Sequence, residues 1–99
     1  RVLRRLSSSI GKSRDDIYYI MPSLVATMGW YSKIASLQED ACATLNNIAN
    51  AGVSNKNTIL RDGGINAIVA AMMANMAVVA VQESACSALL SLASFDDEN

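Results

Sequence analysis

The sequence predicts an all-α protein built from repeated three-helix units. Ala, Leu, Ile and Met dominate its apolar residues, and only five of its 99 residues are aromatic, a composition that favours helices over strands. Apolar residues recur every three to four positions, which places them on one face of a helix. A third observation, an internal repeat, gives the length of the unit.

The repeat has an offset of 44 residues (82 minus 38). Residues 38–49 (QEDACATLNNIA) match residues 82–93 (QESACSALLSLA), and residues 24–28 match residues 68–72 at the same offset. Two separated matches at one offset are hard to obtain by chance. A weaker third copy lies at the start of the chain, at an offset of 42.

These offsets divide the chain into three parts. Residues 1–8 are predicted to be the last helix of one repeat, residues 9–50 a complete repeat, and residues 51–99 a second repeat that ends after its last helix. We therefore expect the chain to be an internal piece of a longer array.

Each unit is predicted to contain a short helix, a tight corner, a middle helix and a long helix. In the complete unit, Ser13 and Asp16 form a capping pattern for the short helix. Pro22 is predicted in the first turn of the middle helix, where its missing N–H costs nothing. Tyr18 and Tyr19 stand where a glycine corner is expected, which leaves the join between the short and middle helices open.

The helix boundaries are marked more clearly in the second unit. Residues 55–61 are predicted to form its short helix, Gly63 and Gly64 its corner, and residues 65–75 its middle helix. The middle helices are apolar almost all round, so we expect them to be covered on several sides. The long helices have apolar faces formed by Ile34, Leu37, Ala41, Leu45 and Ile48, and by Val78, Val81, Ala85, Leu89 and Leu92.

The unit resembles the armadillo repeat. The resemblance rests on Asn57-x-Ile59-x-x-x-Gly63-Gly64-Ile65-x-x-Ile68-Val69 and on the two Gln-Glu-x-Ala-Cys-x-x-Leu-x-x-Ile/Leu-Ala blocks. It implies a right-handed superhelical solenoid of three-helix repeats, with a related HEAT-like array as the alternative.

The resemblance also implies a function, which is to hold a partner protein or an extended peptide along the concave surface of the third helices. The residues that it places on this groove are Arg1, Arg5, Asp40, Ala43, Asn47, Asn50, Ser84, Ser87, Ser91 and Ser94. Amide and hydroxyl groups both donate and accept hydrogen bonds, so this row can bind a peptide backbone. We expect Asn47 and Arg5 to carry the contacts. The alternatives are that the row is merely solvated and that the chain is a structural spacer.

Importin-alpha and similar peptide-binding armadillo proteins place a Trp four residues before an Asn on this groove. Asn47 retains the Asn, but Ala43 and Ser87 occupy the positions of the Trp. Recognition of basic import signals in that mode is therefore disfavoured.

The sequence lacks the residues that other classes of function require. The chain has no His and no CxxC pair, so we expect no catalytic site, no metal site and no cofactor. A net charge of −1 disfavours nucleic-acid binding. Residues 63–82 are uncharged and long enough to span a bilayer, but Asn66, Asn75 and Gln82 make a membrane segment improbable. Two cysteines without a disulfide pattern indicate an intracellular protein, cytoplasmic or nuclear.

Several side chains are predicted to be structural. We expect Cys42 and Cys86 to be buried as small apolar groups, and Met21, Met28, Met72, Met73 and Met76 to fill gaps in the core. Trp30 and Tyr31 are predicted to seal the junction between the middle and long helices, with exposure and contact to a partner as the alternative.

Overall fold

The computed structural model describes residues 14–94, with side chains from residue 17 onward. This part of the chain contains five helices and no strand, which confirms the all-α class. The helices are α2 (Arg14–Trp30), α3 (Ala35–Asn50), α4 (Val53–Arg61), α5 (Gly64–Ala74) and α6 (Val79–Ala93). Residues 1–8, predicted as the last helix of a preceding repeat, lie outside the described residues.

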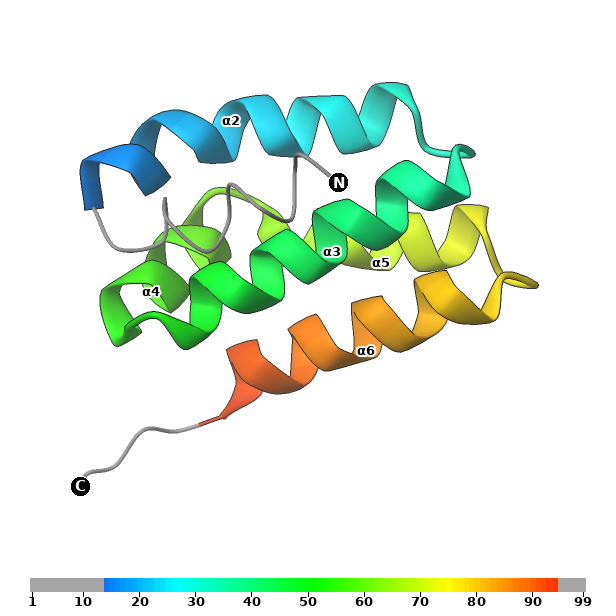
Figure 1. Ribbon diagram of the computed structural model, residues 1–99. Coiled ribbons are helices and arrows are strands. Elements are labelled where there is room, and N and C mark those ends of the chain that lie inside the picture. The colour runs from blue at the N-terminus through cyan, green and yellow to red at the C-terminus, as the bar shows by residue number, and fades with distance from the viewer. Residues whose placement is uncertain (1–13, 95–99) are drawn as a thin grey trace.

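The helices predicted as the long helices of the two units, α3 and α6, lie side by side and form the most extensive helix–helix contact of the described chain (Figure 1). The α2–α3 corner and the α5–α6 corner lie at the same end of the molecule, and α4 lies at the other end. Helices α3 and α6 are the repeat-equivalent long helices, so equivalent positions of the two units face the same side.

The two corners are held by equivalent hydrogen bonds. Gln38 Nε2 donates to the carbonyls of Met28 (3.0 Å) and Tyr31 (2.8 Å). In the second corner, Gln82 Nε2 donates to the carbonyls of Met72 (3.0 Å) and Asn75 (2.9 Å). Each donor and each acceptor of the first corner has its counterpart 44 residues later. The offset found in the sequence therefore recurs in the hydrogen bonds of the structure.

The corner between α4 and α5 depends on two glycines, as predicted. Gly63 has a φ of 86°, in the left-handed region that glycine adopts without strain. At Gly64, a Cβ atom would lie 2.3 Å from Ile59 Cγ2 and 2.9 Å from the Ile59 carbonyl oxygen. The absence of a side chain lets α5 start directly against the end of α4.

The first unit has no such corner. Its predicted short and middle helices form one continuous helix, α2, and Pro22 lies in its interior. The prediction that Pro22 occupies a first turn is therefore wrong. Tyr18 and Tyr19 do not break the helix. Pro22 has no N–H, so the Tyr18 carbonyl lacks its usual helical donor.

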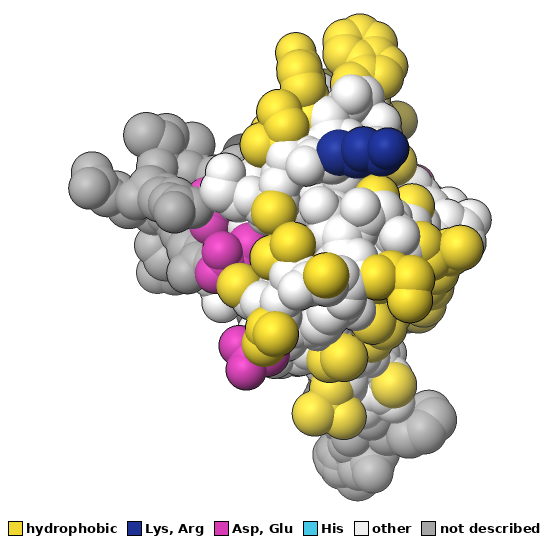
Figure 2. Space-filling view, turned by 90° about the vertical axis from the view of Figure 1, so that its right-hand side faces the viewer, with side chains coloured by type: hydrophobic (Ala, Val, Ile, Leu, Met, Phe, Trp, Pro, Cys, Tyr) yellow, Lys and Arg dark blue, Asp and Glu magenta, His cyan; other side chains and the backbone are white. Residues whose placement is uncertain are grey.

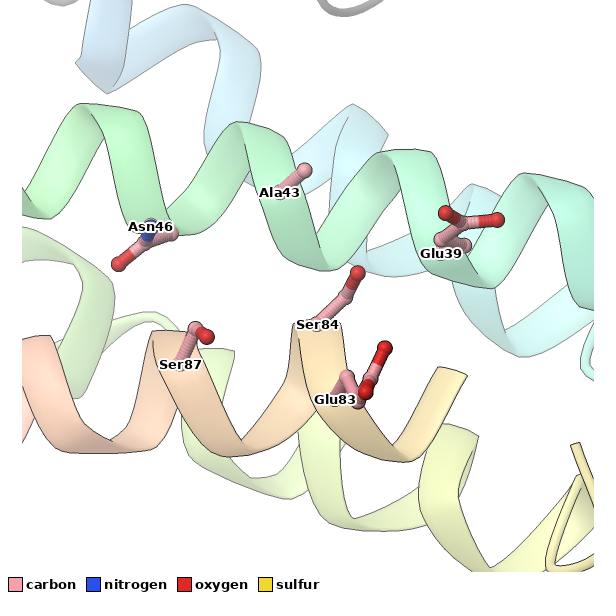
Figure 3. Close-up of a pocket in the computed structure, with 6 residues that line it drawn as sticks. All are labelled: Glu39, Ala43, Asn46, Glu83, Ser84 and Ser87. Atoms are coloured by element: carbon pink, nitrogen blue, oxygen red, sulfur yellow. The ribbon is translucent and has the colours of Figure 1, made fainter. Parts of the chain in front are cut away.

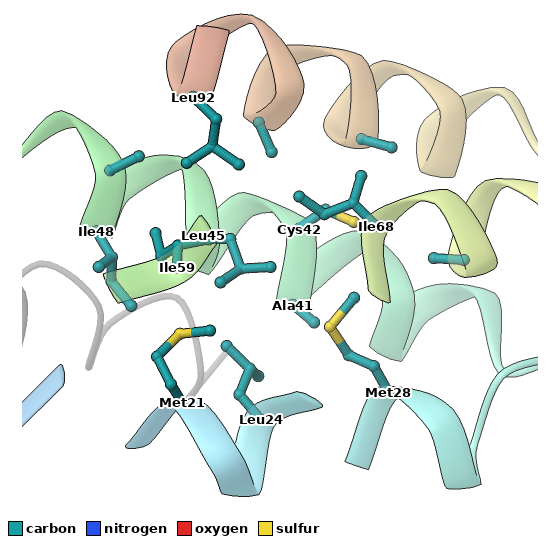
Figure 4. Close-up of a cluster of buried hydrophobic side chains, with 14 of the residues drawn as sticks. Met21, Leu24, Met28, Ala41, Cys42, Leu45, Ile48, Ile59, Ile68 and Leu92 are labelled. Atoms are coloured by element: carbon teal, nitrogen blue, oxygen red, sulfur yellow. The ribbon is translucent and has the colours of Figure 1, made fainter. Parts of the chain in front are cut away.

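The core lies where all five described helices converge, with Ile59 of α4 among its buried residues (Figure 4). It contains Met21, Leu24 and Met28 from α2, and the inward face of α3 with Leu45 and Ile48. From Ala41 on α3 and Val81 on α6, the residues of the predicted apolar faces are buried or partly buried. Ile34 and Val78, at the helix starts, are exposed.

Three further predictions of burial are wrong. The middle helix α5 is covered on one side only, and its Ile65, Val69 and Met73 are exposed. Met73 and Met76 are therefore not core residues, in contrast to Met21 and Met28. Cys86 is exposed, although Cys42 is buried. No described element packs over the outer faces of α5 and α6, and Met76 lies in the exposed corner between these helices.

Candidate functional site

A polar cleft of about 250 Å³ lies between α3 and α6 (Figure 3). Three residues of each helix line it: Glu39, Ala43 and Asn46 from α3, and Glu83, Ser84 and Ser87 from α6. The two helices run along its sides, so their spacing sets its width.

The cleft has an acidic end and a neutral end. Glu39 and Glu83, which are 44 residues apart, lie near the starts of their helices, and the Ser84 hydroxyl lies beside them in Figure 3. Asn46 and Ser87 lie about one turn or more further along. Ala43 is small and leaves space between these ends. The arrangement can accept a cation at one end and hydrogen-bonding groups at the other.

A side-chain contact joins the two helices beyond the neutral end. The Ser91 hydroxyl of α6 donates to Asn46 Oδ1 of α3. The same oxygen accepts a longer, 3.4 Å bond from Asn50 Nδ2. These bonds orient the Asn46 amide and cross-link α3 to α6 next to the cleft.

Some of the predicted groove residues lie at the cleft and others lie outside it. Ala43, Ser84 and Ser87 line the cleft, and Ser91 contacts it through Asn46. Asn47 and Asn50 are exposed on α3 outside the lining, and the Ser94 hydroxyl donates to the Leu90 carbonyl. Arg1 and Arg5 lie outside the described residues.

Asp40 was predicted to lie open in the groove, but in the structure it is only 7 % exposed. Successive helix residues are turned by about 100°, so Asp40 and Asn47 point away from the direction that Glu39 and Asn46 take. The prediction missed Glu39, Asn46 and Glu83. The sequence did contain a signal for the two glutamates, because both repeat blocks open with the same Gln-Glu pair.

The two thiols occupy opposite environments. Burial raises the pKa of the Cys42 thiol from 9.0 to about 11 by desolvating its thiolate, so Cys42 is unreactive near neutral pH. Cys86 is exposed on α6.

Two other kinds of site receive no support from the described residues. No group of three or more His, Cys, Asp or Glu side chains between residues 14 and 94 is placed to hold a metal ion. No helix in this range is long and apolar enough to cross a membrane. The uncharged stretch at residues 63–82 is divided between α5, a corner and the start of α6.

Comparison with known proteins gives no assignment. No family model matches the chain, and neither a curated protein nor a solved structure matches it. The armadillo resemblance and the function that it implies therefore stay predictions.

Proposed function

We propose that the chain is a protein-interaction module of an armadillo-like or HEAT-like solenoid, and that it binds an extended peptide or a segment of a partner protein along α3 and α6. The observation that carries this proposal is the cleft between the two equivalent long helices, with carboxylates at one end and amide and hydroxyl groups at the other. We propose no catalytic role and no cofactor.

The side chains define the ligand chemistry. Glu39 and Glu83 favour a cationic side chain, lysine or arginine, at the acidic end. Asn46, Ser84 and Ser87 offer hydrogen bonds to a peptide backbone. A polar cleft of about 250 Å³ suits one side chain and the adjoining main chain, rather than a folded domain.

The outer face of α6 supports the proposal of an array with flanking repeats. On α3, Cys42, Asn46 and Ala49 lie on the face that packs towards α6, as the Asn46–Ser91 bond demonstrates. Their equivalents on α6 are Cys86, Leu90 and Ala93, and all three are exposed, Leu90 by 71 %. A further unit that packs on α6 as α6 packs on α3 would cover them.

The test is selection of a fully randomised dodecapeptide phage library on the 99-residue chain. We expect enriched peptides to carry Lys or Arg, and we expect this preference to be lost when Glu39→Gln and Glu83→Gln are combined. Asp62→Asn, on the C-cap of α4 and outside the cleft, is the control for the change in charge. A lack of enrichment on every variant would favour the spacer function, and enrichment unaffected by the double substitution would place binding elsewhere.

For cellular location, the two free thiols and the absence of a disulfide among the described residues fit a reducing compartment, and we propose an intracellular protein.

A further inference from the structure

An exposed apolar strip covers the end of the molecule where the two corners meet. It consists of six side chains, between 36 % and 82 % exposed: Trp30, Tyr31, Ile34, Met76, Val78 and Val79. Figure 2 views this end and shows hydrophobic side chains that extend from its top through its centre, with one basic group among them and acidic groups along one margin. Large exposed apolar patches on soluble proteins commonly mark interaction sites.

The strip is held in place by hydrogen bonds, most of them part-buried. Asn75 Nδ2 donates to the Ser32 carbonyl (2.8 Å) and so ties the α5–α6 corner to the α2–α3 corner. Gln38 and Gln82 fix each corner from within, through the carbonyls of the preceding helix ends. Trp30 is 82 % exposed and so does not seal the junction as predicted. The strip is thus a preorganised surface, which lowers the entropic cost of binding.

The strip leads directly into the acidic cleft. Val79 in the strip and Glu83 in the cleft are four residues apart on α6, so they are neighbours on one face of the helix. One helical turn of about 5.4 Å corresponds to about two residues of extended chain. An extended peptide that runs parallel to α6 and places its cationic side chain beside Glu83 therefore brings the side chain two residues away beside Val79, where the strip begins.

The charge of the strip restricts its ligand further. Lys33, in the α2–α3 corner, is exposed and is the one charged residue within residues 30–35 and 74–82. A purely apolar ligand would leave this ammonium group without a counter-charge at the edge of a desolvated contact. A carboxylate beside the bulky apolar residue complements it.

We infer that the strip and the cleft form one bipartite site for an extended peptide, in which a cationic residue enters the cleft, a bulky apolar residue two positions away packs on the strip, and a neighbouring carboxylate faces Lys33. The inference rests on the proposed function and adds to it the spacing and identity of the flanking residues.

The same fully randomised library tests it, with Trp30→Ser and Val79→Ser combined as the strip variant. We expect peptides selected on the unaltered chain to combine Lys or Arg with an aromatic or large aliphatic residue two positions away. The strip variant should retain the cationic preference and lose the apolar one. Tyr19→Ser, an equally exposed aromatic on α2 outside the strip, is the matched control and should change neither preference.

Lys33→Glu supplies a second measurement that does not depend on removing apolar area. Peptides selected on this variant should replace the acidic residue near the apolar position by a basic one. For the best peptide from the unaltered chain, fluorescence anisotropy should show about a tenfold or greater loss of affinity for the strip variant, and less than about a twofold loss for Tyr19→Ser. Circular dichroism would confirm equal helical content.

The outcomes separate the two proposals. Cationic peptides without the apolar residue, or an apolar preference that survives in the strip variant, would overturn the bipartite site while the cleft proposal stands. Loss of all selection would overturn both. If the strip variant instead changes only the self-association of the chain or its binding to lipid vesicles, the strip serves a second copy or a membrane surface, and the inference is wrong.

Discussion

Asn75 and Ser32 join the two units through a hydrogen bond of 2.8 Å from the Asn75 side-chain amide to the Ser32 carbonyl. The same amide donates to the Ala71 carbonyl at 3.0 Å, and the Asn75 side chain is nearly buried. One side chain thus ends α5 and also fixes the neighbouring corner.

Replacement of Asn75 by Ala should lower the free energy of unfolding by about 1–3 kcal/mol, because two carbonyls lose a donor in a place with little access to water. Urea denaturation followed by circular dichroism measures it. Asn66→Ala, at an exposed position of the same helix, should change stability by less than about 0.5 kcal/mol. Equal effects of the two substitutions would show that the Asn75–Ser32 bond contributes no stability.

The equivalent glutamines should differ in their importance. Gln38 is fully buried, whereas Gln82 is partly exposed, although both make the same two bonds. Gln38→Ala should destabilise the chain by about 2–4 kcal/mol, since it leaves unpaired carbonyls and a cavity. Gln82→Ala should cost about 1 kcal/mol, because water can replace the amide. A larger loss for Gln82→Ala in the same denaturation assay would contradict this order.

Substitution by Ala should change stability differently at three of the glycines. At Gly64 the new methyl group meets the Ile59 side chain and carbonyl, so we expect a loss of about 1–3 kcal/mol or more. At Gly63 the left-handed backbone alone costs about 1–2 kcal/mol. At Gly29, in the last turn of α2 and with open space around it, Ala should stabilise by about 0.4–1 kcal/mol, because it restricts the unfolded chain. Thermal denaturation of the three variants tests both sign and order.

The buried Cys42 thiol should make stability depend on alkaline pH. Its folded pKa of about 11 lies above the value of 9.0 without burial, so the folded state keeps its proton where the unfolded state has lost it. Stability is therefore undiminished below about pH 9 and falls by up to about 1.4 kcal/mol per pH unit between about pH 9 and 11.

A Cys42→Ala variant should lack this component and should show a shallower decline with pH than the unaltered chain. The comparison needs only denaturant titrations at a few pH values, with Cys86→Ala as the control that retains the Cys42 titration. Parallel pH profiles for the unaltered chain and the Cys42→Ala variant would mean that Cys42 does not titrate differently on folding.

The sequence was sufficient for the helices of the second unit and for the long helix of the first, but not for the short and middle helices of the first unit. Gly63 and Gly64 mark a corner by their backbone properties, so the ends of α4 and α5 were predictable to within two residues. Tyr18 and Tyr19 carry no such signal, and Pro22 fits either a first turn or, at a cost, a helix interior. Only the packing of the whole helix decides between these alternatives.

The candidate site was predictable in part because periodicity identifies the buried face of a helix, but not the direction of its neighbour. The long helices were correctly located, yet the lining residues Glu39 and Asn46 each precede a predicted residue by one position. The exposure of Met73, Met76 and Cys86 was missed for a related reason. An apolar residue at a helical position is buried only if another element covers it, and the pattern along one chain does not report that.

The exposed thiol of Cys86 gives the outer face of α6 a chemical reporter. Its repeat equivalent, Cys42, is shielded where a second long helix packs beside the first. Any element that docks on α6 in the same manner should slow the alkylation of Cys86, while Cys42 stays protected throughout. The rate of a single labelling reaction would then distinguish a capped end of the helical stack from an open one, whichever element provides the cap.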